Sequence, residues 1–236
     1  MFDIDGTLTQ SSEVDAACFI SAMKTAFNIN HINADWSKYK HFTDSGIFGE
    51  IFESHFHRKP EAVDFDLIKA NFIQVLKAAI EKSRICCSEI AGAVSAFNWL
   101  KNNQNYAVSF GTGCWKESAE LKLKSAGFDF IDIPFAGAED SIEREKIMLI
   151  SLDRAKKKYN IQNFDSITYI GDGVWDVIAS KNLGFNFIGI AQQFDEQKLI
   201  DTGAKFVMPD FKDFTKFLAI LNSLGSDEFV RKGKSK

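Results

Sequence analysis

The chain begins Met1-Phe-Asp-Ile-Asp-Gly-Thr-Leu-Thr9, and this stretch decides the fold. Two carboxylates, Asp3 and Asp5, stand one residue apart where a short apolar run gives way to a glycine. An apolar run that stops at a polar loop is typical of a buried parallel strand. Open α/β sheets bind ligands at the carboxyl ends of their strands. We therefore expect both carboxylates to lie in a ligand-binding crevice.

A second stretch of the same kind lies far downstream. The apolar run at residues 166–170 ends in Gly171 and Asp172, and Asp176 follows four residues later. If the two runs form neighbouring strands, their carboxylates meet at one edge of the sheet. That many like charges do not stay ionised together without a cation. The pattern predicts a metal site.

From about residue 106 onward, strand and helix patterns alternate. We expect strands at residues 106–110, 133–136, 167–170, 187–190 and 206–208, with helices at residues 115–126, 143–159, 174–182 and 211–224. Alternation of this kind predicts an α/β fold, because right-handed crossovers produce a parallel sheet with helices on both faces. The expected core is therefore a Rossmann-like, doubly wound sheet.

Residues 11–88 follow a different pattern. Ile68, Phe72, Val75 and Leu76 recur at helical spacing, and no convincing strand is found in this stretch. We expect an all-helical cap domain here, inserted between the first two strands. The α/β core domain then consists of residues 1–10 and 89–236.

The composition narrows the class of protein. The 236 residues carry a net charge of −4, which argues against nucleic acid as the main partner, because phosphate binding usually leaves a basic footprint. The four cysteines show no CxxC spacing, and reduced thiols in a cytosolic protein are the default. No leader is apparent, and no apolar run approaches the ~18 residues of a membrane span. These features predict a soluble, cytoplasmic protein that binds no membrane, while its oligomeric state is open. Only two residues precede Asp3, so either the first strand is short or the native start lies upstream of Met1.

Four motifs in a fixed order resemble those of the haloacid dehalogenase-like superfamily. Residues 3–9 resemble the first motif, and residues 108–113 resemble the second, a strand that ends in Thr or Ser. Arg144 is similar to the basic third motif, and residues 171–176 resemble the last. The helical insert stands where the family carries its C1 cap. The resemblance covers nearly the whole chain and implies the phosphatase branch of the family.

The third motif departs from the commoner family pattern, which has Lys. Arg144 stands at this position, and Lys146 lies two residues further on. Residues two apart on a helix do not share a face, so only one of them can point into the site. The alignment favours Arg144.

The resemblance also implies roles for the carboxylates. Asp3 would be the nucleophile that forms an aspartyl-phosphate, since a carboxylate is ionised at neutral pH and needs no base. Asp5 would be the general acid and base, and we expect crowding by Asp3 to raise its pKa. The metal would be Mg²⁺, held by the side chains of Asp3 and Asp172 and by the backbone carbonyl of Asp5. Asp176 would orient a metal-bound water from the second shell.

The resemblance also implies which groups bind the phosphate. Thr112 and the backbone amides around Gly113 would hold the phosphoryl oxygens at the start of a helix. Arg144 would neutralise the charge that develops on those oxygens.

The function these features imply is a Mg²⁺-dependent phosphatase acting on a small phosphorylated metabolite, with the cap excluding bulk water and bulky substrates. A phosphomutase of the same architecture uses the same motifs and is the first alternative. A phospho-accepting signalling domain without turnover is the second, and the helical insert argues against it. Dehalogenation is disfavoured, because that branch of the family lacks the acid two residues after the nucleophile, where Asp5 stands here.

Overall fold

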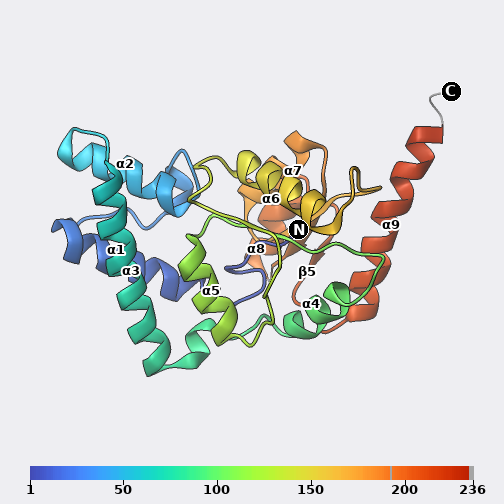
Figure 1. Cartoon of the computed structure of the whole chain (residues 1–236), viewed down its shortest axis with the longest axis horizontal. Coiled ribbons are helices and arrows are strands. Elements are labelled where there is room, and N and C mark those ends of the chain that lie inside the picture. The colour runs from blue at the N-terminus through green and yellow to red at the C-terminus, as the bar shows by residue number, and fades with distance from the viewer. Residues whose placement is uncertain (192, 234–236) are drawn as a thin grey trace.

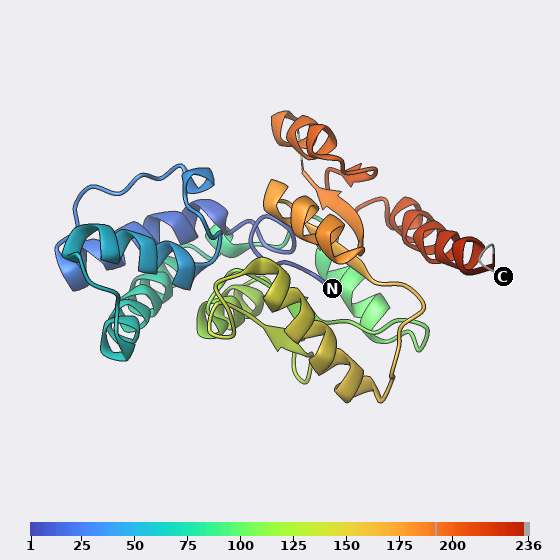
Figure 2. The same cartoon turned by 90° about the horizontal axis from the view of Figure 1, so that it is seen from above.

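The computed structural model describes residues 1–191 and 193–233. Figures 1 and 2 show two parts that differ in secondary structure. Three helices from the first third of the chain gather on one side, and the rest of the chain surrounds a parallel sheet. Within the described residues, no helix combines the length and the apolar character needed to span a bilayer.

In the described part of the chain, five short strands and the N-terminal segment form the sheet. The strands are β1 (Phe110–Gly111), β2 (Phe135–Ala136), β3 (Thr168–Gly171), β4 (Asn186–Ile190) and β5 (Val207–Met208). β1 pairs in parallel with β2, and β4 pairs in parallel with both β3 and β5. Phe2 makes parallel bridges to Phe110 and Ile170, so residues 1–3 join the two groups of strands.

Backbone hydrogen bonds place the N-terminal segment at the centre of the sheet. On one side the Phe2 amide donates to the Ser109 carbonyl at 2.9 Å, and the Gly111 amide donates to the Phe2 carbonyl at 3.0 Å. On the other side the Asp3 amide donates to the Ile170 carbonyl at 2.9 Å. The first residues of the chain are therefore neighbours of residues 109–111 and of β3.

Helices cover both faces of the sheet. They are α4 (Ala93–Lys101), α5 (Lys116–Ser125), α6 (Arg144–Tyr159), α7 (Val174–Leu183), α8 (Phe194–Thr202) and α9 (Phe214–Gly233). Successive strand residues point to opposite faces. Tyr169 accordingly packs with Met148 of α6 and Ala179 of α7. Its neighbour Ile170 belongs to a second cluster, which contains Phe97 of α4 and residues of α9. The sheet is doubly wound, as the alternation predicted.

The helical segment, residues 11–88, has an apolar core of its own. It contains α1 (Ser12–Phe27), the 3-10 helix η1 (Trp36–Lys38), α2 (Asp44–Phe56), α3 (Ala62–Lys82) and the 3-10 helix η2 (Arg84–Cys87). Phe19, Phe48, Phe72 and Leu76 are buried together in this core. Trp115, from the loop before α5, joins the same cluster and stacks on Phe19 at 6.1 Å. An aromatic side chain of the sheet region thus anchors the helical segment.

The α/β class and the helical N-terminal region are confirmed, while some element boundaries differ from expectation. The strand expected at residues 106–110 is regular only at Phe110–Gly111, and the helix expected from residue 211 begins at Phe214. Helix α8 was missed altogether. Its sequence, FDEQKLIDT, is mostly polar, so its apolar periodicity is too weak to show a helix.

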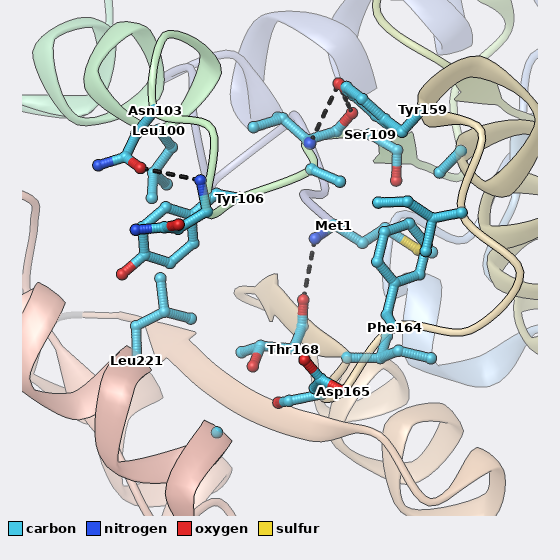
Figure 3. Close-up of a pocket in the computed structure, with 18 of the residues that line it drawn as sticks. Met1, Leu100, Asn103, Tyr106, Ser109, Tyr159, Phe164, Asp165, Thr168 and Leu221 are labelled. Atoms are coloured by element: carbon cyan, nitrogen blue, oxygen red, sulfur yellow. Dashed lines mark hydrogen bonds between the residues drawn. The ribbon is translucent and has the colours of Figure 1, made fainter.

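A cavity of about 650 Å³ opens at the amino ends of the central strands, around Met1 (Figure 3). The Met1 amine donates to the Thr168 carbonyl at 2.9 Å, and Tyr106, Tyr159 and Leu221 stand around it. Because the strands are parallel, this cavity lies at the opposite edge of the sheet from the predicted crevice of carboxylates.

Candidate active site

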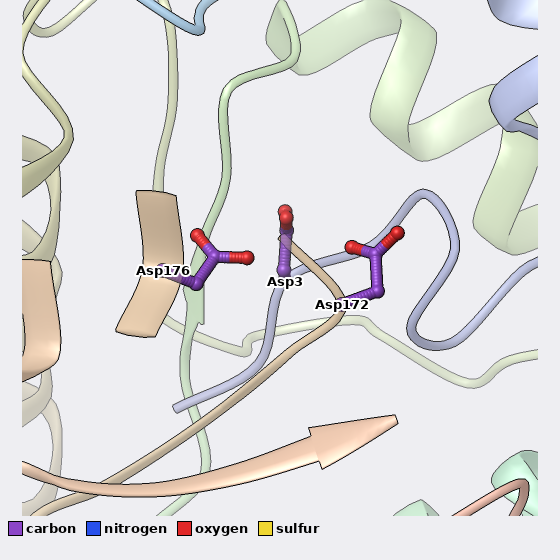
Figure 4. Close-up of side chains that lie close together, drawn as sticks. All are labelled: Asp3, Asp172 and Asp176. Atoms are coloured by element: carbon purple, nitrogen blue, oxygen red, sulfur yellow. The ribbon is translucent and has the colours of Figure 1, made fainter. Parts of the chain in front are cut away.

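Three carboxylates converge at the carboxyl ends of the central strands (Figure 4). Asp3, Asp172 and Asp176 each offer one oxygen, and these atoms all lie within 4.8 Å of one another. We call this group the acidic cluster. Asp3 ends the N-terminal segment, Asp172 follows β3, and Asp176 lies in the first turn of α7. Pairing of Phe2 with Ile170 brings these distant stretches together.

Local hydrogen bonds orient each carboxylate of the acidic cluster. The Ile4 amide donates to Asp3 Oδ1 at 2.8 Å, and the Thr7 hydroxyl donates to Asp172 Oδ1 at 3.3 Å. The Gly173 amide donates to Asp176 Oδ2 at 3.1 Å, which also closes the first turn of α7. The backbone around each strand end therefore aims these side chains toward a common point.

The acidic cluster has the character of a cation site. Burial raises the pKa of Asp172 well above its ordinary value, and the charges of Asp3 and Asp176 raise it further. The pKa of Asp176 rises to about 7, because burial and the Asp3 charge outweigh the opposing effect of Arg144. Asp176 Oδ1 is buried and accepts no hydrogen bond from any described residue. Clustered carboxylate oxygens with an orphaned acceptor fit Mg²⁺, which prefers hard oxygen ligands.

Arg144 points into the acidic cluster from the first turn of α6. Its Nη1 lies 3.5 Å from Asp3 Oδ1, and its Nε lies 3.4 Å from Asp176 Oδ1. Burial alone would lower the pKa of Arg144, but Asp176 and Asp3 outweigh it and raise the pKa well above its ordinary value. Lys146 points away from the cluster, is 61% exposed and pairs with Glu143 at 2.7 Å. Of the two basic candidates, Arg144 is the one that the structure brings to the carboxylates.

Asp5 turns away from the acidic cluster toward a second cation. Its Oδ2 lies 2.6 Å from Lys122 Nζ and accepts a hydrogen bond from the Cys114 thiol at 2.7 Å, and its Oδ1 accepts one from the Ser11 hydroxyl. Burial raises the pKa of Asp5, but Lys122 and these hydrogen bonds outweigh it, so the pKa is lowered. The expected upward shift of the Asp5 pKa is therefore wrong. Its cause, Lys122, lies 117 residues away in the chain and could not be paired with Asp5 by inspection.

Lys122 also joins the two parts of the molecule. Its ammonium group is completely buried and lies 2.5 Å from Asp15 Oδ1 on α1 as well as 2.6 Å from Asp5. Sequence reasoning missed both Lys122 and Asp15. A signal was present, since Lys122 stands beside Ala119 and Leu123 on the buried stripe of α5. A lysine on such a stripe is rarely buried without a partner.

The predicted phosphate-binding residues lie beside Asp3, with fewer free amides than expected. Thr112 and Gly113 line the cavity above the acidic cluster. The Trp115 amide at the start of α5 already donates to Asp44 Oδ2 at 2.8 Å, and the Lys116 amide donates to Glu139. Within residues 1–191 and 193–233, the Gly113 amide has no acceptor. The Gly113 amide is therefore free to donate beside Thr112.

A cavity of about 190 Å³ lies between the acidic cluster and the helical segment. Phe42, from the loop before α2, closes over it: its carbonyl accepts a hydrogen bond from Arg144 Nη2 at 3.3 Å. The Phe42 ring stacks on Trp175 with centroids 4.8 Å apart. The Asp44 amide also donates to the Gly113 carbonyl at 2.8 Å. The helical segment thus touches the predicted phosphate-binding residues directly.

Comparison with known proteins agrees with this geometry. The family model of the haloacid dehalogenase-like hydrolases matches residues 1–190, so the chain belongs to this family. Its fold is similar to that of a hydrolase from Pseudomonas syringae, with a TM-score of 0.69 and 20% identity over 92% of this chain and 96% of the other.

Two further structures share the fold. A putative beta-phosphoglucomutase from Bacteroides vulgatus has a TM-score of 0.66 and 17% identity over 94% of this chain and 88% of the other. A predicted phosphoglycolate phosphatase from Haemophilus somnus has a TM-score of 0.62 and 17% identity over 92% and 96%. No curated protein matches the chain. At these identities the likeness concerns the fold alone.

We expect Gly6→Ala to disrupt the acidic cluster. Gly6 has a φ of +72°, and a Cβ there would lie 1.9 Å from Asp172 Oδ2. The variant should lose at least about 1 kcal/mol of unfolding free energy from backbone strain and should lose Mg²⁺-dependent stabilisation in thermal unfolding. Gly49→Ala is the control, because a Cβ at this helical position meets nothing within 4 Å. Wild-type stabilisation by Mg²⁺ in Gly6→Ala would contradict the close approach.

Removal of Lys122 should be strongly destabilising. Lys122→Met leaves Asp5 and Asp15 buried without their shared cation, which typically costs about 3–5 kcal/mol. Urea unfolding measures the loss, and Lys124→Met, at an exposed position of the same helix, should change stability by less than about 0.5 kcal/mol. Adding Asp15→Asn to Lys122→Met should recover part of the loss. Equal midpoints for the two single variants would contradict this role of the ion pairs.

Proposed function

We propose that this hydrolase is a Mg²⁺-dependent phosphatase that acts on a small phosphate monoester through an aspartyl-phosphate intermediate. The observation that carries the proposal is the position of Asp3. Its carboxylate belongs to the acidic cluster, lies 3.5 Å from Arg144, and lines a cavity of about 190 Å³. A nucleophile, a cation site and a fixed positive charge are what transfer of a phosphoryl group requires.

The metal would be held by the side chains of Asp3 and Asp172 and by the backbone carbonyl of Asp5. When bound, Mg²⁺ neutralises carboxylate charge and stabilises the charge on the phosphoryl oxygens. Asp176 accepts the Gly173 amide and faces Arg144, and from this position it would orient a water of the ion.

Asp3 accepts the phosphoryl group, and Asp5 transfers the protons. An Asp3 oxygen attacks phosphorus, the bond from phosphorus to the alcohol oxygen breaks, and that oxygen takes a proton from Asp5. Water then attacks the phosphorus of the aspartyl-phosphate while Asp5 takes a proton from that water. The Asp3 carboxylate is regenerated, and inorganic phosphate is released. Because Lys122 favours the ionised form of Asp5, the monoanionic ester would supply the proton that Asp5 passes to the leaving oxygen, and the side chain is then ionised for the second step.

The phosphoryl group would be held beside Asp3. The Thr112 side chain and the free Gly113 amide line the cavity there, and Arg144 Nη2 lies next to Gly113. These donors would stabilise the negative charge of the transition state more than that of the substrate, which is the requirement for catalysis.

Residues 11–88 would act as a cap domain over a core made of residues 1–10 and 89–236. The contacts of Phe42 with Arg144 and Trp175 support this division, because they place the helical segment over the nucleophile. A cavity this small, closed in this way, favours a small metabolite and keeps out bulk water.

Asp3→Asn should reduce turnover of a phosphate monoester at least about a thousandfold, because the amide cannot form the aspartyl-phosphate. Release of inorganic phosphate from p-nitrophenyl phosphate measures it, with Mg²⁺ present or removed by a chelator. Asp66→Asn, at an exposed site on α3, is the matched control and should keep wild-type activity. Full turnover in Asp3→Asn or in the chelator would defeat the proposal. An isomerised ester without free phosphate, seen by phosphorus NMR, would indicate a mutase instead.

Substitution of Arg144 should lower kcat/KM far more than substitution of Lys146. Arg144→Met removes the charge that faces Asp3 and should lower kcat/KM by about 10²–10³, as loss of a transition-state donor does. Lys146→Met removes an exposed charge from the same helix and should change kcat/KM by no more than about twofold. A larger loss in Lys146→Met than in Arg144→Met would overturn the assignment of the basic residue.

A further inference from the structure

The upper part of the active-site cavity differs in chemistry from its floor. The floor carries the proposed phosphoryl-transfer residues, namely Asp3, Asp5, Thr112, Gly113, Arg144 and Asp172. The rest of the lining contains four aromatic residues and two acids, together with small polar and aliphatic residues: Phe19, Trp36, Phe42, Trp175, Asp15 and Asp44, with Ser12, Ala16, Thr43, Ile47 and Cys114. With the phosphoryl group on the floor, the alcohol part of the ester must lie among these residues, which form the walls.

The walls offer no positive charge to a second anionic group. Among the described residues that line the cavity, Arg144 is the only cationic side chain, and it already faces Asp3 and Asp176. Lys122 lies behind the wall, completely buried and paired with Asp5 and Asp15. A carboxylate or second phosphate on the substrate would therefore be buried beside acids without a counter-charge, which is strongly unfavourable.

Asp44 is an acid of this wall that forms no ion pair within the described residues. It is only 8% exposed and lines the cavity, and burial together with the charge of Asp15 raises its pKa well above the ordinary value against the opposing charge of Lys122. Its Oδ2 accepts the Trp115 amide at 2.8 Å, which fixes the side chain in place. A positive charge carried by the substrate would complete this partly satisfied carboxyl group.

Aromatic rings form another part of the wall. Trp36 meets Phe19 edge to face with centroids 5.9 Å apart, and Phe42 stacks on Trp175 at 4.8 Å. All four rings line the cavity. Ring faces attract ammonium groups, and an aromatic enclosure completed by a carboxylate is a recurring way to bind them.

We propose that the alcohol released by this enzyme is a small amino alcohol, so that the substrate is the phosphate monoester of a cationic alcohol of about the size of ethanolamine or choline. This inference rests on the proposed phosphatase function and names its substrate class. The lack of a spare cation among the described lining residues disfavours carboxylated and doubly phosphorylated esters, and the volume of about 190 Å³ favours small ones.

The test compares kcat/KM for four esters in the presence of Mg²⁺. Phosphoethanolamine and phosphocholine carry the cation, 3,3-dimethylbutyl phosphate is the neutral carbon isostere of phosphocholine, and phosphoglycolate carries a second anion. We expect both cationic esters to exceed the neutral one by at least about tenfold and phosphoglycolate to be the poorest. An equal or faster reaction of the neutral or anionic ester would overturn the inference.

A variant that removes the charge of Asp44 tests whether this residue causes the preference for cationic esters. Asp44→Asn keeps an oxygen that can accept the Trp115 amide but removes the negative charge, so the ratio of kcat/KM for phosphocholine to that for its neutral isostere should fall toward one. Asp66→Asn removes an exposed charge from the same helical segment and should leave the ratio unchanged. Because both esters are measured on one preparation, partial unfolding of a variant cancels from the ratio. An unchanged ratio in Asp44→Asn contradicts the inference.

Failure of the inference can be told from failure of the proposed function. If no ester, including p-nitrophenyl phosphate, releases phosphate, the phosphatase function is wrong. If p-nitrophenyl phosphate is hydrolysed with loss of activity in Asp3→Asn, but neutral or anionic esters react best, only the amino alcohol assignment is wrong.

Discussion

The electrostatic repulsion among carboxylates at the ends of two adjacent buried strands is the constraint on which the rest of this structure depends. Pairing of Phe2 with Ile170 makes Asp3 and Asp172 neighbours in a crevice where water is scarce. Their charges can coexist there only with positive charge nearby. Arg144 supplies part of it from α6, 3.5 Å from Asp3 and 3.4 Å from Asp176, and a divalent ion held by Asp3 and Asp172 would add the rest.

A second ion-pair system separates the two carboxylates of the first motif. Asp3 faces Arg144, whereas Asp5 faces the buried Lys122, so residues two apart in sequence experience different cations. This separation suits two different roles, because a nucleophile must remain ionised while an acid and base must exchange a proton. Lys122 also contacts Asp15 on α1, which makes the environment of Asp5 depend on the position of the helical segment.

The helical segment contributes chemistry as well as enclosure. Its Asp44 accepts the amide at the start of α5, a position that the motif alone would assign to substrate phosphate. Its aromatic side chains Phe19, Trp36 and Phe42 line the cavity together with Trp175 of α7. In the proposed phosphatase, the residues that would bind the phosphoryl group come mainly from the sheet region, and those that would contact the alcohol come mainly from the helical segment. Under this proposal, specificity and phosphoryl chemistry would reside in different stretches of the chain.

Local patterns in the sequence predict the α/β class and the helical N-terminal region, because the periods of strands and helices are read within short windows. The same patterns place acids at the ends of two apolar runs, but these ends meet only because Phe2 pairs with Ile170. Helical periodicity allows only one of Arg144 and Lys146 to face inward, and the resemblance to the third motif favoured Arg144. Sequence reasoning missed α8, because its mostly polar residues show no apolar periodicity, and it led to the wrong direction for the pKa shift of Asp5. Only the tertiary structure decided that direction, the burial of Lys122 and the charge of the cavity walls. These features arise between residues distant in sequence, and burial changes the energy of a charge according to neighbours that no local pattern identifies.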